Sequence, residues 1–222
     1  MRYLVIGGNG HAQEVAWSLG EHERGRGASY EILFFDDAIA PGPLESGLGP
    51  LIGPLDAVAG YADRRGTLLV LGVGLPRLKA QLVERLESTG LAWATVIHPR
   101  AIVGPNVEID AGCYVAAGAI LTVNVRLGAF ATVNMHAQVA HDSVVERFAT
   151  LHPNARLAGN VRVSEGAELG TSSTVVPGRT IGPWAILGAG AVAVDSLDGG
   201  RTYVGIPARP RPGTPVSMRR RA

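Results

Sequence analysis

An apolar residue recurs at every sixth position, without a break, through much of the second half of this 222-residue chain. A period of six fits neither an amphipathic helix nor a plain alternating strand. It predicts a chain that turns a corner every six residues, so that three short parallel strands form one triangular coil and successive coils stack through backbone hydrogen bonds. The fifteen apolar positions are Val103, Ile109, Val115, Leu121, Leu127, Val133, Val139, Val145, Leu151, Leu157, Val163, Leu169, Val175, Ile181 and Leu187.

A small residue follows each of these apolar residues at the fourth position, with Arg179 as the exception. We expect the apolar residue to point into the prism and the small residue to fit the tight corner. Fifteen hexads at three per coil predict a left-handed parallel β-helix of about five coils. The single cysteine, Cys113, occupies one of the small-residue positions, so we interpret it as a packing residue and not as a nucleophile.

The first hundred residues lack this repeat and alternate strands with helices instead. Strands are expected over residues 2–6, 30–35 and 67–71, and a helix over residues 11–19 follows the first strand. This alternation predicts an α/β, Rossmann-like domain built on a small parallel sheet. A second helix is expected to begin at Pro76, with an inward face made of Leu78, Leu82, Val83 and Leu86.

The length of the chain allows two modest domains. We expect the Rossmann-like domain over residues 1–96, the β-helix over 97–209 and a flexible tail over 210–222. A formal net charge of +1 gives no reason to expect a nucleic acid partner. The sequence carries no recognisable membrane span or secretion signal, so we expect a cytoplasmic protein that does not insert into a membrane.

A glycine turn at residues 7–10 lies between the first expected strand and the first helix. Such a turn lets a phosphate approach backbone N–H groups at a helix start, and Asp36 or Asp37, at the end of the next strand, would accept hydrogen bonds from a ribose or a base. A nucleotide is therefore the natural ligand. The third glycine of a dinucleotide fingerprint is missing, since position 13 is Gln13, and a purely structural tight turn stays open as the alternative.

The phase of the repeat places His136, His141 and His152 on the outside of the prism. An imidazole in a cleft between neighbouring prisms would take a proton from an attacking amine or hydroxyl near neutral pH. For His22, His98 and His152 we prefer the alternative of a solvated surface histidine. His141 is followed by Asp142, which can orient the imidazole only if the pair lies at a bend or across a subunit boundary.

A zinc site is an alternative use of these histidines. His136 and His141 are five residues apart, and the gamma-class carbonic anhydrases hold zinc between β-helix subunits through three histidines. A third histidine is expected about two coils earlier, where this chain has Arg100, and His98 is out of place by two residues. We therefore expect no metal, and keep the zinc enzyme as a minor alternative.

Motifs spread over nearly the whole chain carry a family resemblance: VIGGNGH at residues 5–11, FDD at 35–37, IHP at 97–99, AHD at 140–142, LAGNV at 157–161 and VGIPA at 204–208. With these motifs the chain resembles the sugar O-acyltransferases and nucleotide-amino-sugar N-acetyltransferases of the sialic acid O-acetyltransferase type. The resemblance implies homotrimers with acetyl-CoA as donor. It also implies that the amino-terminal domain holds the sugar nucleotide, and that acyl transfer takes place in the cleft between adjacent β-helices.

The resemblance also assigns site residues. It implies that His141 is the general base and Asp142 its acidic partner, with Asn134 near the active site. Some family members carry a second histidine near the CoA thioester where this chain has Thr150, whose hydroxyl is at best a weak substitute. The implied CoA contacts are Thr150, Gly159, Thr171 and Gly188, and the implied nucleotide contacts are Gly8, Asn9, Gly10, His11, Asp36 and Asp37.

These features predict an acetyl-CoA-dependent N-acetyltransferase that acts on the amino group, at C4, of a nucleotide-linked amino deoxy-sugar for surface glycans. We expect direct transfer without a covalent enzyme intermediate, because no motif pairs a serine with a base. The alternatives are an O-acetyltransferase of sialic acid or a related sugar, the gamma carbonic anhydrase-like zinc enzyme, and a catalytically silent scaffold.

Overall fold

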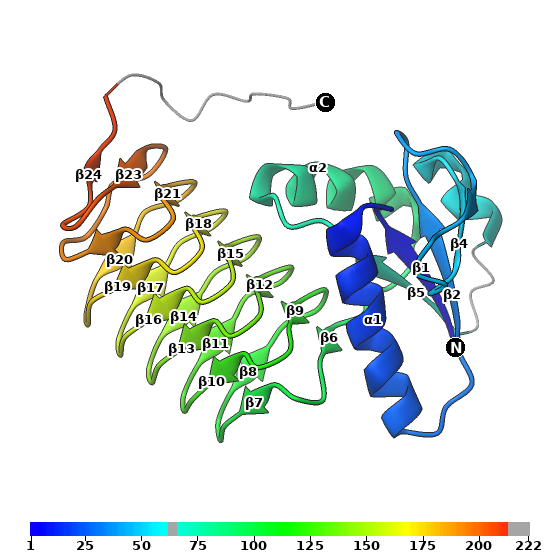
Figure 1. Ribbon diagram of the computed structural model, residues 1–222, viewed down its shortest axis with the longest axis horizontal. Coiled ribbons are helices and arrows are strands. Elements are labelled where there is room, and N and C mark those ends of the chain that lie inside the picture. Colours follow the sequence, from blue (N-terminus) through cyan, green and yellow to red (C-terminus); the bar gives the residue numbers. More distant parts are fainter. Residues whose placement is uncertain (62–65, 213–222) are drawn as a thin grey trace.

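The computed structural model describes residues 1–61 and 66–212. An α/β part at the amino terminus lies beside a triangular prism of short strands (Figure 1). The predicted β-helix is confirmed, and its coils run from the junction with the α/β part to the far end of the prism.

The amino-terminal part is a five-stranded sheet in the order β3-β4-β2-β1-β5. Strand β1 pairs in parallel with both β2 and β5, and β4 extends the sheet in parallel beyond β2. One face packs against α1 and the other against α2 and η1, so apolar clusters cover both faces. The elements are β1 (Arg2–Ile6), α1 (Gly10–Gly25), β2 (Glu31–Phe35), β3 (Gly42–Pro43), β4 (Pro50–Gly53), η1 (Leu55–Tyr61), β5 (Thr67–Leu71), α2 (Pro76–Leu86) and η2 (Glu87–Thr89).

Helix α2 begins at Pro76 as expected, but its inward face is only partly the predicted one. Leu86 is buried and Leu82 packs against the same cluster, as predicted, but Leu78 is 39% exposed and Lys79 is buried instead. The ammonium group of Lys79 donates hydrogen bonds to Phe130 O at 2.8 Å, to Thr132 Oγ1 at 3.1 Å and to Ala149 O at 3.2 Å. The prediction was wrong for Leu78 because α2 packs on a rim of backbone carbonyls, which need a donor, and not only on apolar side chains.

The β-helix has three parallel faces, and strands pair at a spacing of 18 residues except at the last coil, where Ile186 of β21 pairs with Thr202. The first face holds β7 (Ile102–Val103), β10 (Ile120–Leu121), β13 (Gln138–Val139), β16 (Arg156–Leu157), β19 (Thr174–Val175) and β22 (Val192–Ala193). The second face holds β8 (Glu108–Ile109), β11 (Arg126–Leu127), β14 (Val144–Val145), β17 (Arg162–Val163) and β20 (Thr180–Ile181). The third face holds β6 (Val96–Ile97), β9 (Tyr114–Val115), β12 (Thr132–Val133), β15 (Thr150–Leu151), β18 (Glu168–Leu169), β21 (Ile186–Leu187), β23 (Thr202–Val204) and the antiparallel β24 (Arg209–Pro210).

The apolar residues of the repeat fill the prism as predicted, with two exceptions at the end where the repeat begins. From Val115 onward each of them is buried in one continuous core. Val103 is 41% exposed and Ile109 only partly buried, because no coil precedes them on the first two faces. From Cys113 onward the predicted small residue is buried directly after the turn, with Arg179 as the exception, whereas the turn itself is made one position earlier, by a residue with positive φ.

The amino-terminal part docks on the third face of the β-helix. Ser18 in α1 shares a hydrogen bond of 3.1 Å with Tyr114 in β9, and Thr150 in β15 donates to Gly74 O at 2.7 Å. Within the described ranges, no helix is both long and apolar enough to cross a membrane. Most of the tail expected over residues 210–222 lies outside the described residues.

Candidate active site

His141 and Asp142 meet at a corner between the first and second faces. Asp142 has a φ of 58°, so the chain bends there, and His141 Nδ1 lies 2.8 Å from Asp142 Oδ2. The bend required for neighbouring residues to meet is therefore present. The side chains are 55% and 45% exposed, so the pair is open to a ligand arriving from outside the prism.

Asparagines of the two preceding coils form a row of hydrogen bonds that ends at this carboxylate. Asn124 Nδ2 donates to Asp142 Oδ1 at 2.8 Å, and Asn106 Nδ2 donates to Asn124 Oδ1 at the same distance. Hydrogen bonds from His141 and Asn124 lower the pKa of Asp142, so the carboxylate stays ionised beside the imidazole. Sequence reasoning missed both asparagines, although their spacing of 18 residues from one coil to the next was readable in the repeat.

Gly159 lies one coil after His141 and leaves room for its ring. A Cβ atom on Gly159 would come within 2.4 Å of His141 Cε1 and Nε2. Gly159 does not have a positive φ, so what the position requires is the absence of a side chain and not a special backbone conformation. The predicted residues His141, Asp142 and Gly159 thus form one group.

The glycine turn before α1 is built as a helix start. Asn9 caps the helix, with Oδ1 accepting from Ala12 N at 3.3 Å, and Gly10 has open space where a side chain would be. Asp36 Oδ2 accepts a hydrogen bond of 2.9 Å from Gly8 N. Exposed Asn9 and Gly10 at a helix N-terminus make a suitable approach for an anionic group such as a phosphate.

Asp37 has partners of its own within the protein. Its carboxylate accepts from Leu55 N at 3.0 Å and pairs with Arg85, which also pairs with Asp56. Arg85 and Leu55 N–H together hold the pKa of Asp37 below its usual value. Asp36 therefore contacts the glycine turn directly, whereas Asp37 connects the end of β2 to η1 and α2.

His11, Asn134 and Thr150 lie where the amino-terminal part meets the third face. The ring of His11 packs edge-on against Tyr114, with 5.7 Å between ring centroids, and burial lowers its pKa. Asn134 is 6% exposed, and its Oδ1 accepts from Met135 N at 2.7 Å. Thr150 is fully buried and its hydroxyl is engaged with Gly74 O, so a contact to CoA would have to compete with this hydrogen bond.

The remaining predicted CoA contacts lie further along the β-helix. Thr171 is exposed, and its carbonyl accepts from Gly190 N at 2.9 Å. Gly188 follows β21 on the third face, and a Cβ there would come within 2.9 Å of Val204 Cγ1. Neither residue contacts the group formed by His141, Asp142 and Gly159 within one chain, and both stay predictions.

One of the histidines interpreted as solvated is not on the open surface. His98 is 1% exposed, accepts from Arg100 N at 3.0 Å and packs on Trp17, because it lies where α1 covers the first coil. The interpretation was therefore wrong for His98. His152 lies outside the prism as expected and is partly exposed, but it pairs with Glu168, with 2.7 Å between Nε2 and Oε1.

Cys113 is buried and donates to Gly128 O at 3.2 Å, and burial raises the pKa of its thiol to about 11. A thiol held in its protonated form is a poor nucleophile, in keeping with a packing role.

His136 and His141 do not converge within one chain. His136, with a φ of 56°, forms the corner between the third and first faces, whereas His141 lies at the next corner. In the described ranges no three His, Cys, Asp or Glu side chains form a group that would hold a metal ion.

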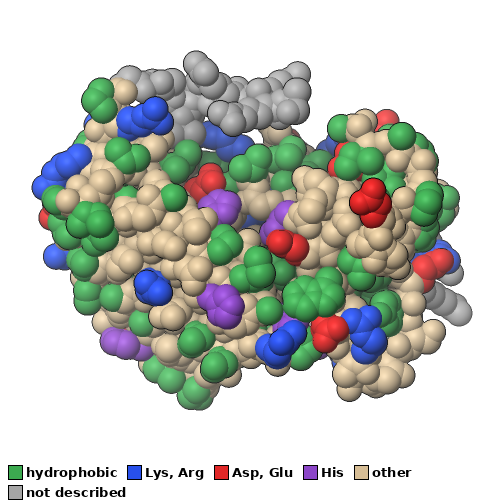
Figure 2. All heavy atoms as spheres, in the orientation of Figure 1, with side chains coloured by type: hydrophobic (Ala, Val, Ile, Leu, Met, Phe, Trp, Pro, Cys, Tyr) green, Lys and Arg blue, Asp and Glu red, His purple; other side chains and the backbone are tan. Residues whose placement is uncertain are grey.

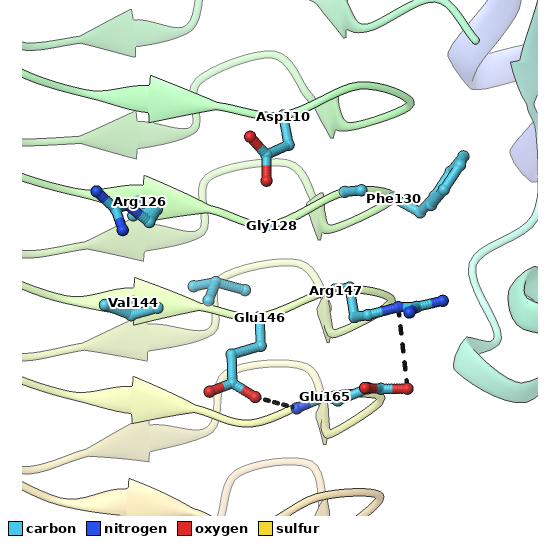
Figure 3. Close-up of a pocket in the computed structure, with 10 residues that line it drawn as sticks. Asp110, Arg126, Gly128, Phe130, Val144, Glu146, Arg147 and Glu165 are labelled. Carbon is cyan, nitrogen blue, oxygen red and sulfur yellow. Dashed lines mark hydrogen bonds and ion pairs between the residues drawn. The ribbon is translucent and has the colours of Figure 1, made fainter. Parts of the chain in front are cut away.

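A separate pocket lies on the second face, beside the corner that faces α2 (Figure 3). Glu146 accepts from Glu165 N at 2.9 Å, and Arg147 pairs with Glu165 at 3.9 Å. No residue of this pocket belongs to the predicted site. Its lining is Asp110, Arg126, Gly128, Ala129, Phe130, Val144, Val145, Glu146, Arg147 and Glu165.

The predicted site residues thus form two groups on different sides of the prism. His141 projects from the corner between the first and second faces, whereas the glycine turn and His11 lie against the third face, opposite that corner. A single chain does not bring the two groups together.

Comparisons with known proteins connect this arrangement to a family. The acetyltransferase domain of PglB from Neisseria gonorrhoeae FA1090 is 31% identical to the chain, with a TM-score of 0.87 and coverage of 95% of this chain and 99% of that domain. A variant of perosamine N-acetyltransferase from Caulobacter crescentus, solved in complex with CoA and GDP-perosamine, is 31% identical, with a TM-score of 0.85 and coverage of 96% and 98%. The chain belongs to the sugar acetyltransferases of the hexapeptide-repeat β-helix type.

Membership of the sugar acetyltransferases confirms the resemblance drawn from the motifs. A GDP-perosamine N-acetyltransferase from Escherichia coli O157:H7 is also similar, at 26% identity over 226 residues, which are 97% of this chain and 99% of that protein. No protein-family model matches the chain. As a sugar acetyltransferase, the protein is an acyltransferase enzyme, as predicted.

Proposed function

We propose that this protein transfers the acetyl group of acetyl-CoA to the amino group of a nucleotide-linked amino sugar. The observation that carries the proposal is the exposed His141–Asp142 pair, which lies above a glycine that leaves space beside the imidazole. The relatives named for perosamine make a 4-amino deoxy-sugar linked to GDP the first acceptor to test.

The proposed chemistry is direct transfer. With His141 Nδ1 bonded to Asp142, Nε2 is the atom that takes a proton from the acceptor amine. The amine nitrogen bonds to the acetyl carbonyl carbon, the carbon–sulfur bond breaks, and CoA leaves as its thiol after protonation. The ionised Asp142 stabilises the imidazolium that forms during the transfer.

A homotrimer would complete the site. Each chain carries His141 on one side of its prism and the glycine turn with His11 on the other, so a neighbouring copy is needed to bring them to one acceptor. In this arrangement the amino-terminal part, acting as a Rossmann-like nucleotide-binding domain, holds the sugar nucleotide, and His141 of an adjacent copy reaches its amine. We place the reaction in the cytoplasm, where acetyl-CoA is supplied.

Thiol release from acetyl-CoA tests this function. The parent protein and His141→Ala are supplied with UDP-, GDP- and dTDP-linked 4-amino sugars and with free and CMP-linked sialic acid. We expect release with one amino sugar and a loss of about a hundred- to ten-thousandfold in the variant. Release with sialic acid alone would replace N-acetylation by O-acetylation, and a fully active variant would remove His141 from the mechanism.

A further inference from the structure

His152 and Glu168 form a second histidine–carboxylate pair, distinct from His141 and Asp142. His152 Nε2 lies 2.7 Å from Glu168 Oε1, and the two side chains are 28% and 21% exposed. They follow β15 and begin β18, two adjacent strands of the third face. The pair is therefore fixed in position by the β-helix and still reachable by solvent.

This pair lies at the junction with the nucleotide-binding part. His152 comes two residues after Thr150, so both point outward from the third face, and Thr150 donates to Gly74 O at 2.7 Å. Gly74 in turn lies under the ring of His11, since a Cβ atom there would be 3.5 Å from His11 Nε2. The pKa of His11 is lowered mainly by burial, and His152 is close enough to contribute to the same direction. Figure 2 shows histidine and acidic side chains gathered between the β-helix and the amino-terminal part.

His152 retains a ring nitrogen for a ligand. Glu168 occupies Nε2, and no hydrogen bond to Nδ1 is found among residues 1–61 and 66–212. Asn134 occupies the equivalent position one coil earlier, at the inter-strand spacing of about 4.8 Å. Its Oδ1 is engaged with Met135 N, so its amide group is left to donate.

We propose that His152, oriented by Glu168, binds a hydroxyl group of the acceptor sugar and so helps to determine which sugar is acetylated. This inference rests on the proposed function, because it assumes that the sugar extends from the glycine turn along the third face. His152 and Glu168 take no part in the proton transfer, which is assigned to His141.

Charge favours a sugar hydroxyl over a phosphate at this position. Glu168 contacts His152, and Glu14 lies 3.5 Å from the ring of His11, so two carboxylates oppose the approach of an anion. The pyrophosphate is better accommodated at the N-terminus of α1, by Asn9 and Gly10. A neutral sugar hydroxyl that donates to His152 Nδ1 avoids this repulsion.

Binding measurements separate the sugar contact from the nucleotide contact. Isothermal titration compares GDP-perosamine, the corresponding UDP- and dTDP-linked 4-amino sugars, and the nucleoside diphosphates alone, on the parent and on His152→Ala. For the tightest sugar nucleotide we expect about three- to tenfold weaker binding by the variant, which is the loss of one neutral hydrogen bond. Binding of the nucleoside diphosphate alone should be unchanged. His136→Asn, at an exposed corner with positive φ that asparagine tolerates, is the matched control and should bind like the parent.

A mutant cycle tests the role of Glu168. Glu168→Ala alone should weaken sugar-nucleotide binding, and the double variant should bind no worse than His152→Ala, because the carboxylate acts through the imidazole. In the transfer assay, KM for the amino sugar should rise in His152→Ala while KM for acetyl-CoA stays constant.

Equal affinity of the parent and His152→Ala for every sugar nucleotide would overturn the proposal. The proposal would also fail if the parent bound each sugar nucleotide with the same affinity as the nucleoside diphosphate alone. If the parent transfers acetyl groups and His152→Ala behaves identically, the proposed function stands and this inference fails. If the parent binds the sugar through His152 but releases no thiol, the sugar contact stands and the proposed acetyl transfer fails.

Discussion

Asp142 has two roles in this protein: it forms a corner of the β-helix and it bonds to the imidazole of His141. Only a residue with positive φ turns the corner, and an aspartate tolerates that conformation better than most side chains. Because the corner reverses the chain, its carboxylate reaches the imidazole of the preceding residue, which a regular strand would prevent. The sequence showed that Asp142 can orient His141 within one chain only if the chain bends at this pair. The structure shows this bend, because Asp142 is the corner residue of its coil.

Replacing Asp142 by asparagine separates charge from shape. Asparagine keeps the left-handed corner but removes the negative charge that stabilises an imidazolium. We expect Asp142→Asn to lower kcat/KM about ten- to a hundredfold, corresponding to one charge-assisted hydrogen bond, with no change in thermal stability. Full activity in Asp142→Asn would show that Asp142 does not act on His141.

At the scale of the coil, glycines one coil away make room for rings at several corners. A Cβ on Gly112 would meet the ring of Phe130, and one on Gly166 would meet that of Trp184, as one on Gly159 would meet His141. The 18-residue spacing that pairs these positions follows directly from the hexad period. The hexad period thus predicted the stacking of the coils, and it also makes it possible to find, 18 residues away, the glycine that faces each ring.

Gly159→Ala tests the coil contact at the active site. The new methyl group would meet the His141 ring at 2.4 Å and displace it, while the backbone conformation of residue 159 is open to alanine. We expect kcat to fall by about a hundredfold, as after misplacement of a catalytic group by about 1 Å. The circular dichroism spectrum and thermal midpoint should stay close to those of the parent.

The control for this substitution is Gly25→Ala, at the end of α1, where nothing lies within 4 Å of the new methyl group. It should have parental activity. Parental kcat in Gly159→Ala would mean that the imidazole does not work from the position seen in the structure.

The β-helix was predictable from the sequence because one rule, the burial of an apolar residue every six positions, governs every coil from Val115 onward. The docking of the amino-terminal part follows no repeat. The burial of Lys79 depends on backbone carbonyls 50 or more residues away, those of Phe130 and Ala149. Local patterns carry no information on such contacts, which is why Leu78 was wrongly placed inside and His98 was wrongly interpreted as solvated.

Lys79 joins the two parts of the molecule and should make their association sensitive to pH. Burial lowers the pKa of its ammonium group to about 7, whereas the unfolded chain has a value of about 10.4. Between these values the unfolded state binds more protons than the folded state, so the free energy of unfolding should rise as pH increases from about 7 to about 10. The neighbouring Cys113 thiol, with its pKa raised to about 11, titrates largely above this window.

Lys79→Met removes the titrating group while keeping an unbranched side chain of similar length. We expect the variant to be less stable than the parent, because Phe130 O, Thr132 Oγ1 and Ala149 O lose their donor. Its stability should also lose the rise with pH that the parent shows. Urea unfolding of both proteins at fixed concentration, from pH 7 to pH 9.5, measures the two curves. The gap between them should widen as the pH rises, because only the folded parent releases a proton and gains stability. Parallel curves would mean that Lys79 stays charged in the folded protein, held by its three oxygen acceptors.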